Sequence, residues 1–256
     1  MIDLHCHLLP GIDDGARDLA TSLEMARLAV QDGVRIQACT PHITPGIYDN
    51  DGAQIRQAVE ELAAALYDNG IDLYLVTGAD VHLAPRMIEG MRTGRIPTLA
   101  DSRYFLLEPP HHIVPQRMDE VVEDLCAAGY VPVLTHPERL SWIETHYSYI
   151  KRLVAAGAWV QLTAGSITGS FGSQPRYWAE RMLDEGIVHL IASDGHNTGR
   201  RRPGLAAARA AVAERLGEAE AEHVSVTRPL GIVKNWAPAD IVAPPALDAA
   251  GGTRST

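Results

Sequence analysis

The chain begins Met1-Ile2-Asp3-Leu4-His5-Cys6-His7, an apolar strand start that runs directly into a pair of histidines. In a β-strand alternate side chains share a face, so His5 and His7 can both point at one ion. The same event recurs along the chain, where a short apolar run ends and a His, Asp or Glu follows. The residues at these later strand ends are His42, Asp80, Glu108, His136, Asp194 and His196. We interpret this pattern as a site for several metal ions on one face of a barrel.

Apolar runs alternate with helical patterns along the whole chain, which implies βαβ units and a parallel sheet. Seven such units in one domain favour a closed or nearly closed α/β barrel, and no GxGxxG motif follows the first run. The expected strands are Met1–Leu4, Val34–Cys39, Leu73–Thr77, Tyr104–Leu107, Tyr130–Leu134, Trp159–Leu162 and Val188–Ala192. The expected helices are Leu19–Gln31, Ala53–Asn69, Arg86–Met91, Pro115–Ala128, Tyr149–Ala156, Arg176–Asp184 and Leu205–Leu216.

The length of 256 residues suits one large domain, which we expect over residues 1–237. Residues 238–256 are rich in Ala, Pro and Gly, and we expect them to form a flexible tail. The apolar share of 46% and the charged share of 21% are ordinary for a globular domain.

The bulk charge and the cysteines exclude several classes of protein. A formal net charge of −10 argues against a general nucleic-acid-binding surface, which would need a basic stripe. Three cysteines without CxxC spacing predict no disulfide framework, so we expect them to pack in the interior. No leader-like segment precedes Asp3 and no apolar run reaches 18 residues, so we expect a cytoplasmic protein without stable membrane insertion.

The candidate ligands comprise five imidazoles and four carboxylates, which are too many for one tetrahedral ion and suit two or three ions with bridging carboxylates. Three divalent ions against four carboxylates leave a net charge of +2, which attracts a phosphate dianion. Such a cluster also lowers the pKa of a bridging water toward neutrality. Any single Asp at a strand end could instead cap a helix. The nine candidate ligands all follow strand ends, and this shared position favours metal binding. The nine are His5, His7, Asp14, His42, Asp80, Glu108, His136, Asp194 and His196.

Two arginines near these residues suit a phosphate, because a guanidinium fork binds two phosphate oxygens. Arg139 follows the fifth strand, and Arg201 lies just past His196 in the run Arg200–Arg202. The alternatives are that Arg139 pairs with Glu138 and that most of the Arg200–Arg202 run is simply solvated. We assign Arg139, Arg201 and Asp14 as catalytic residues, with Asp14 also a metal ligand.

At these positions the chain resembles the PHP (polymerase and histidinol phosphatase) superfamily, and more closely its CpsB/YwqE branch of bacterial manganese-dependent protein-tyrosine phosphatases. The resemblance covers about residues 1–215 and implies a PHP-type distorted (β/α)7 barrel. The matching segments are Ile2-Asp3-Leu4-His5-Cys6-His7-Leu8-Leu9-Pro10-Gly11-Ile12-Asp13-Asp14-Gly15, Ala38-Cys39-Thr40-Pro41-His42, Thr135-His136-Pro137-Glu138-Arg139 and Ala192-Ser193-Asp194-Gly195-His196-Asn197.

The resemblance implies three ions and a division of the ligands among them. His5 and His7 would hold the first ion with Asp80 and Asp194. Glu108 and His136 would hold the second with the bridging acid, and Asp14, His42 and His196 the third. The arginines would bind the phosphate, and the implied metal is manganese, with iron and zinc as alternatives.

One departure from the family pattern concerns the bridging acid, which is usually Glu and is Asp80 here. One methylene fewer shortens its reach by about 1.5 Å. We therefore expect weaker bridging or one ion held less firmly.

The resemblance implies a tyrosine phosphatase in which metal-bound hydroxide attacks phosphorus in line, on a phosphotyrosine protein such as a bacterial tyrosine kinase of capsule or exopolysaccharide synthesis. The alternatives are a small-molecule phosphatase of the histidinol-phosphate kind and an inactive metal-binding regulatory domain; a nuclease is disfavoured by the acidic charge. No cysteine is followed six residues later by Arg, which excludes phosphocysteine chemistry. The aromatics that could stack on a phenyl ring, or equally pack in the interior, are Tyr48, Trp142, Tyr147 and Tyr149.

Overall fold

The computed structural model describes residues 1–247 and contains nine short strands, all paired in parallel. Two sheets have the orders β1-β2-β4 and β3-β5-β6-β7-β8-β9. The strands are β1 (Ile2–Asp3), β2 (Ile36–Cys39), β3 (His42–Ile43), β4 (Tyr74–Thr77), β5 (Asp80–His82), β6 (Tyr104–Glu108), β7 (Val131–Thr135), β8 (Trp159–Thr163) and β9 (Leu190–Ala192).

The nine strands form seven lines around one barrel, because β3 continues the line of β2 and β5 continues that of β4 after two residues each. The first and last lines then meet. The His7 N–H donates to the Gly195 carbonyl (2.9 Å), and the Asp194 N–H donates to the His5 carbonyl (2.9 Å). This pairing closes the barrel, and the α/β barrel expected from the sequence is confirmed.

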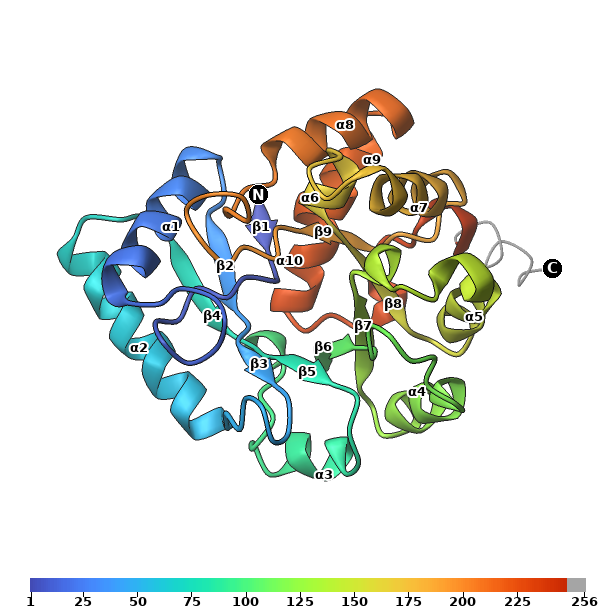
Figure 1. Ribbon diagram of the computed structural model, residues 1–256, viewed down its shortest axis with the longest axis horizontal. Coiled ribbons are helices and arrows are strands. Elements are labelled where there is room, and N and C mark those ends of the chain that lie inside the picture. Colours follow the sequence, from blue (N-terminus) through green and yellow to red (C-terminus); the bar gives the residue numbers. More distant parts are fainter. Residues whose placement is uncertain (248–256) are drawn as a thin grey trace.

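Helices surround the ring of strands, and α10 lies behind its centre (Figure 1). The helices are α1 (Leu19–Gln31), α2 (Gly52–Asp68), α3 (Met87–Arg92), α4 (Met118–Ala127), α5 (Ile143–Ala155), α6 (Ala164–Ile167), α7 (Ser173–Asp184), α8 (Ala206–Leu216), α9 (Glu218–Glu222) and α10 (Arg228–Val233). Short 3-10 turns span Leu99–Asp101, Pro137–Arg139 and Pro238–Asp240, and a π-turn spans His223–Thr227. Within residues 1–247, no helix combines the length and hydropathy needed to cross a membrane.

Two hydrophobic cores follow from the alternation of side chains along the strands. The larger core lies between strands and helices, and it contains Phe105 and Leu107 of β6. The smaller core contains Tyr104 and Leu106 of the same strand together with Ile232 of α10. The inward side of each strand therefore fills the barrel, and α10 covers one end.

The C-terminal part of the described chain differs from what the sequence predicts. Helices α9 and α10 were not expected, and residues 238–247 pack against the barrel. Ile241 is buried, and the Ala246 N–H donates to the carbonyl of Gly186 (3.1 Å). The expected tail therefore starts with an ordered segment, held by the bonds of α10 to residues 242 and 243. Residues 248–256 lie outside the described residues, and for them the tail stays a prediction.

Candidate metal centre

The predicted site residues lie where strand lines end, as the barrel geometry requires. Asp80 opens β5 in register with Leu106, and Glu108 is the last residue of β6, two places beyond Leu106 on the same side. His42 opens β3 and pairs in register with Asp80. The structure brings all nine predicted ligands together at this end of the barrel, with His5, His7, Asp80, His136, Asp194 and His196 buried.

The first expected ion has four potential ligands close to one another. The Nε2 atoms of His5 and His7 are 3.3 Å apart. Asp194 Oδ1 lies 3.5 Å from each of them, and Asp80 Oδ2 lies 3.4 Å from that of His5. Two imidazoles and two carboxylates around one point are a suitable donor set for a divalent ion.

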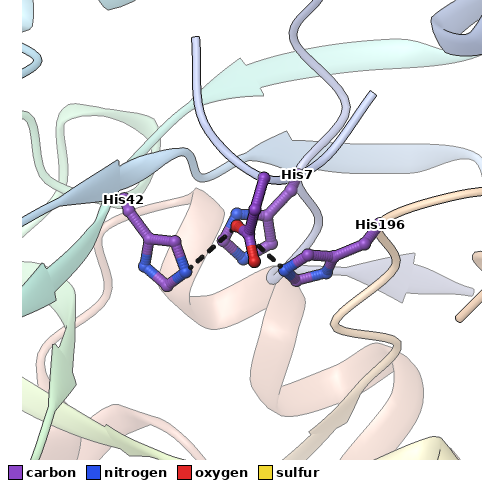
Figure 2. A group of neighbouring side chains, drawn as sticks. His7, His42 and His196 are labelled. Atoms are coloured by element: carbon purple, nitrogen blue, oxygen red, sulfur yellow. Dashed lines mark ion pairs between the residues drawn. The ribbon is translucent and has the colours of Figure 1, made fainter. Parts of the chain in front are cut away.

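A second group surrounds Asp14 at the mouth of the barrel. Asp14 Oδ1 lies 3.5 Å from Nε2 of His42 and 3.5 Å from Nε2 of His196. Figure 2 shows the rings of His42 and His196 directed toward each other, with His7 between and behind them. The ring centroids of His7 and His196 are 3.8 Å apart, so the donor atoms of the first and third expected ions are contiguous.

Several of these imidazoles are oriented by a hydrogen bond at Nδ1. His5 Nδ1 contacts Oε1 of Gln161 (2.9 Å), and His7 Nδ1 contacts Oδ2 of Asp13 (2.7 Å). His196 Nδ1 contacts the carbonyl of Asp194 (2.9 Å). A partner on Nδ1 leaves Nε2 free as a ligand, an arrangement typical of metal-binding histidines.

Unpartnered buried atoms provide a test of whether metal fits the site. Among the described residues, both carboxylate oxygens of Asp80 and the Nδ1 atoms of His42 and His136 are buried without a hydrogen-bond partner. Such groups cost free energy unless something else satisfies them. Carboxylate oxygens and imidazole nitrogens that lack hydrogen-bond partners are therefore suited to bind cations.

Sequence reasoning missed three residues of this site. Asp13 lies beside Asp14 in the loop after β1, but its contact with His7 depends on how the loop folds. Gln161 lies within β8, where no motif marks it. His111 follows β6 in the segment Pro109–His112, and its imidazole lies within 4.8 Å of the ligand atoms of Glu108 and His136. The signal available in the sequence was its position three residues after a strand end.

Burial and neighbouring charges shift the pKa values of several side chains in this cluster. Burial and the charge of Asp80 raise the pKa of Glu108 to about 9. Burial opposes protonation of His7, but its bonds to Asp13 and Asp194 raise its pKa to about 10. Burial and then Arg139 lower the pKa of His111 to about 4. Without cations, the cluster therefore holds protons at neutral pH that cations would replace.

Both predicted arginines contact the site through Asp194. Nη1 of Arg139 and Nη2 of Arg201 donate to Asp194 Oδ2, the latter over 2.7 Å. Arg200 and Arg202 are exposed. The alternative pairing of Arg139 with Glu138 does not occur, because Oε1 of Glu138 accepts the N–H of Thr163 instead (2.9 Å).

Comparison with known proteins gives the family directly. A family model described as "Capsular polysaccharide synthesis, CpsB/CapC" matches residues 1–234. This chain belongs to the CpsB/CapC family. The matched range includes every predicted ligand and both arginines.

Relatives of known name agree with this membership of the CpsB/CapC family. Tyrosine-protein phosphatase YwqE of Bacillus subtilis is 39% identical over 197 residues, covering 77% of this chain and 78% of the relative. Tyrosine-protein phosphatase CpsB of Streptococcus pneumoniae is 27% identical, covering 91% and 98%. A crystal structure from a study of YwqE and CpsB, described as metal-dependent tyrosine phosphatases, superposes with a TM-score of 0.91 at 33% identity, covering 96% of this chain and 98% of the other.

Only one of the four aromatic residues considered for substrate stacking faces the site of this CpsB/CapC protein. The ring of Tyr48 stacks on that of His42, with centroids 5.6 Å apart at 14°, and borders a cavity of about 410 Å³. Trp142, Tyr147 and Tyr149 are buried. For these three the packing alternative holds, as Trp142 donates to the Pro110 carbonyl (2.9 Å) and Tyr149 to the Pro115 carbonyl (2.7 Å).

Two of the predicted ligands have left-handed backbone conformations, which L-residues other than Gly rarely adopt. The φ angle is 37° at His136 and 50° at Asp194. Each residue follows directly or closely on a strand, β7 or β9, so the turn directs its side chain back over the barrel. Such local strain is common where a site requires a particular direction of a side chain.

Proposed function

We propose that this protein is a metal-dependent protein-tyrosine phosphatase that hydrolyses phosphotyrosine monoesters. The observation that carries the proposal is a cluster of imidazoles and carboxylates, several with unpartnered buried atoms, that lies beside two arginines at the open end of a barrel. Family membership and the names of the relatives support the same activity.

The nine predicted ligands would hold two or three divalent ions, for which we propose manganese. When bound, such ions lower the pKa of water so that hydroxide is available near neutral pH, and they offset the charge of a phosphate. Mixed nitrogen and oxygen donors without thiolates suit manganese or iron and do not suit a structural zinc site.

Arg139 and Arg201 would bind the phosphate oxygens and stabilise the charge on the equatorial oxygens during transfer. Both already lie at Asp194, so the phosphate would be held next to the first expected ion. The guanidinium of Arg139 also lies 5.0 Å from the ring centre of Phe171, which restricts its orientation.

Tyr48 and the adjoining cavity supply a place for the phenyl ring of phosphotyrosine. The cavity is lined by apolar side chains, among them Ile43, Val81 and Ile96, and by charged ones, Asp49, Asp51, Arg86 and Arg95. The apolar side chains beside Tyr48 suit a phenyl ring, and the charged ones suit the polar peptide around a phosphotyrosine. We propose a tyrosine-phosphorylated protein as substrate, specifically a bacterial tyrosine kinase of capsule or exopolysaccharide synthesis, in accord with the family description. The cytoplasmic location stays a prediction.

The experiment that tests the proposal combines chelation with two substitutions. Chelated protein should lose hydrolysis of a phosphotyrosine peptide and regain it with added Mn²⁺. His136→Ala should lose both bound metal and rate. Arg139→Ala should keep its metal and lower kcat/KM by about 10²–10³-fold, whereas Arg200→Ala, an exposed neighbour of Arg201, should stay close to the wild type.

Two outcomes would contradict this function. Full activity in protein shown to be free of metal would reject the metal-dependent mechanism. Faster hydrolysis of histidinol phosphate than of the phosphotyrosine peptide would reject the substrate class and leave the metal centre in place.

A further inference from the structure

We propose that His111 is a tenth metal ligand, which binds the ion held by Glu108 and His136; this inference rests on the proposed function. The imidazole belongs to a group in which the ligand atoms of His111, Glu108 and His136 all lie within 4.8 Å of one another. The rings of His111 and His136 have centroids 5.4 Å apart at 41°.

The second expected ion would otherwise depend on Glu108, His136 and the bridging Asp80, which it shares with the first ion. Asp80 lies in two other groups, one with His5 and His7 and one with His42 and Glu108. Catalytic ions commonly have three protein ligands and an open position for water or substrate. Because Asp80 is shared with the first ion, His111 would complete a set of three further ligands together with Glu108 and His136.

The backbone around His111 is fixed in a way that suits a ligand. Its carbonyl accepts two hydrogen bonds from Ser141, from the N–H (3.1 Å) and from the hydroxyl (2.9 Å). The preceding carbonyl, of Pro110, accepts a bond from the indole of Trp142 (2.9 Å). These contacts join the loop after β6 to the segment that follows Arg139, so the backbone that carries the imidazole is fixed beside the site.

The neighbouring His136 is placed to share an ion with Glu108. His136 is only 3% exposed, and its Nδ1 has no partner among residues 1–247. Its Nε2 lies 4.0 Å from Oε1 of Glu108, too far for a hydrogen bond and suitable for two atoms that share an ion.

The neighbouring His112 offers a matched control. It has the same side chain in the same loop, is exposed, and belongs to none of the groups of ligand atoms. Substitution at His112 therefore reproduces the loss of an imidazole from this loop without the loss of a ligand.

The test measures metal binding by the full chain and not only its activity. Protein freed of metal by a chelator is titrated with Mn²⁺ by calorimetry, and ions per chain are counted by mass spectrometry after desalting. We expect His111→Ala to bind its weakest ion at least about tenfold less tightly than the wild type and to retain fewer ions. His111→Gln, which keeps polarity and size, should behave in the same way, and His112→Ala should match the wild type.

The inference is overturned if His111→Ala and His111→Gln, both folded by circular dichroism, match His112→Ala in affinity and in ions per chain. Wild-type protein that takes up Mn²⁺ and hydrolyses a phosphotyrosine peptide would then leave the proposed function intact. Wild-type protein that takes up no ion would overturn both.

Discussion

The side chains around His7 and Glu108 determine how the metal-free site responds to pH. At neutral pH the metal-free protein carries a proton on each group, since the pKa of His7 is raised to about 10 and that of Glu108 to about 9. A bound cation requires a neutral imidazole and an ionised carboxylate. Metal and protons therefore compete for the same atoms.

We predict that Mn²⁺ binding releases protons and tightens as the pH rises from 6 to 8. Calorimetry in two buffers with different ionisation enthalpies measures the number of protons released. Asp13→Asn removes a bond that raises the pKa of His7, so this variant should release fewer protons. An affinity independent of pH over this range would show that the groups are already deprotonated.

The raised pKa values of His7 and Glu108 also predict how the stability of the metal-free protein depends on pH. Stability should fall as the pH rises, whereas metal binding should tighten. Both folded-state pKa values lie above the ordinary values of 6.5 for His and 4.5 for Glu. The folded state thus binds more protons than the unfolded state, and the free energy of unfolding should fall as the pH rises toward 9–10. Urea denaturation at pH 6.5 and 9 measures this fall.

At the level of residues, the nine candidate ligands named from the sequence lie together in the structure, because strand ends of a barrel converge. Their role as ligands stays a prediction. The sequence motifs did not locate Asp13, Gln161 or His111, whose roles depend on side-chain direction and loop path. The four aromatic residues considered for substrate stacking also show what the sequence alone cannot predict. Their position in substrate-side segments was visible in the sequence, but burial separates Tyr48 from Trp142, Tyr147 and Tyr149.

The loop between β1 and α1 brings Asp13 and Asp14 to the site by folding back onto His7. The Ala16 N–H donates to the His7 carbonyl (3.1 Å), and Gly15 lies directly against that residue. A Cβ placed on Gly15 would lie 2.2 Å from the His7 carbonyl oxygen and 2.4 Å from its Cβ. Only glycine permits this approach.

We predict that Gly15→Ala destabilises the protein by about 1–3 kcal/mol and weakens Mn²⁺ binding, because the clash displaces the backbone on both sides of the site. The control is Gly199→Ala, whose added Cβ would have an ordinary contact at 3.5 Å with Asn197. Thermal unfolding and calorimetry measure the two effects. Equal melting temperatures for both variants would show that the loop relaxes without cost.

The helices were predicted with uneven success, for local reasons. Helix α1 has the predicted bounds, and its N-cap is Asp18, whose Oδ1 accepts the Thr21 N–H (2.8 Å). Helix α5 begins at Ile143 and not at Tyr149, and the backbone at His146 departs from helical angles. That kink interrupts the apolar period on which the shorter prediction relied.

In the whole molecule, a buried ion pair joins the C-terminal segment to the barrel. The guanidinium of Arg228 is fully buried; it donates to Glu220 (2.6 and 3.1 Å) and to the carbonyls of Val242 (2.8 Å) and Ala243 (2.9 Å). No sequence motif predicts this contact, since it joins segments without an amphipathic pattern. The barrel itself was predictable from the rhythm of strands and helices.

We predict that Glu220→Gln lowers the free energy of unfolding by about 3–5 kcal/mol, because it leaves the charge of Arg228 buried without its counter-ion. Glu218→Gln removes an exposed partner of Arg209 and should cost less than about 1 kcal/mol. Urea denaturation of metal-loaded protein measures both. Equal costs would mean that the carbonyl oxygens alone suffice to stabilise the guanidinium.

The closure of the barrel between its first and last strand lines has a consequence for biosynthesis. The first histidines leave the ribosome early, but their partners Asp194 and His196 are made nearly 190 residues later. A nascent chain that ends before Leu190 lacks β9 and the turn that carries both residues, and with them one wall of the candidate metal centre. Because contacts of such sequence separation form late in folding, ion uptake marks a finished barrel, and a truncated chain released by a stalled ribosome would fail to mature.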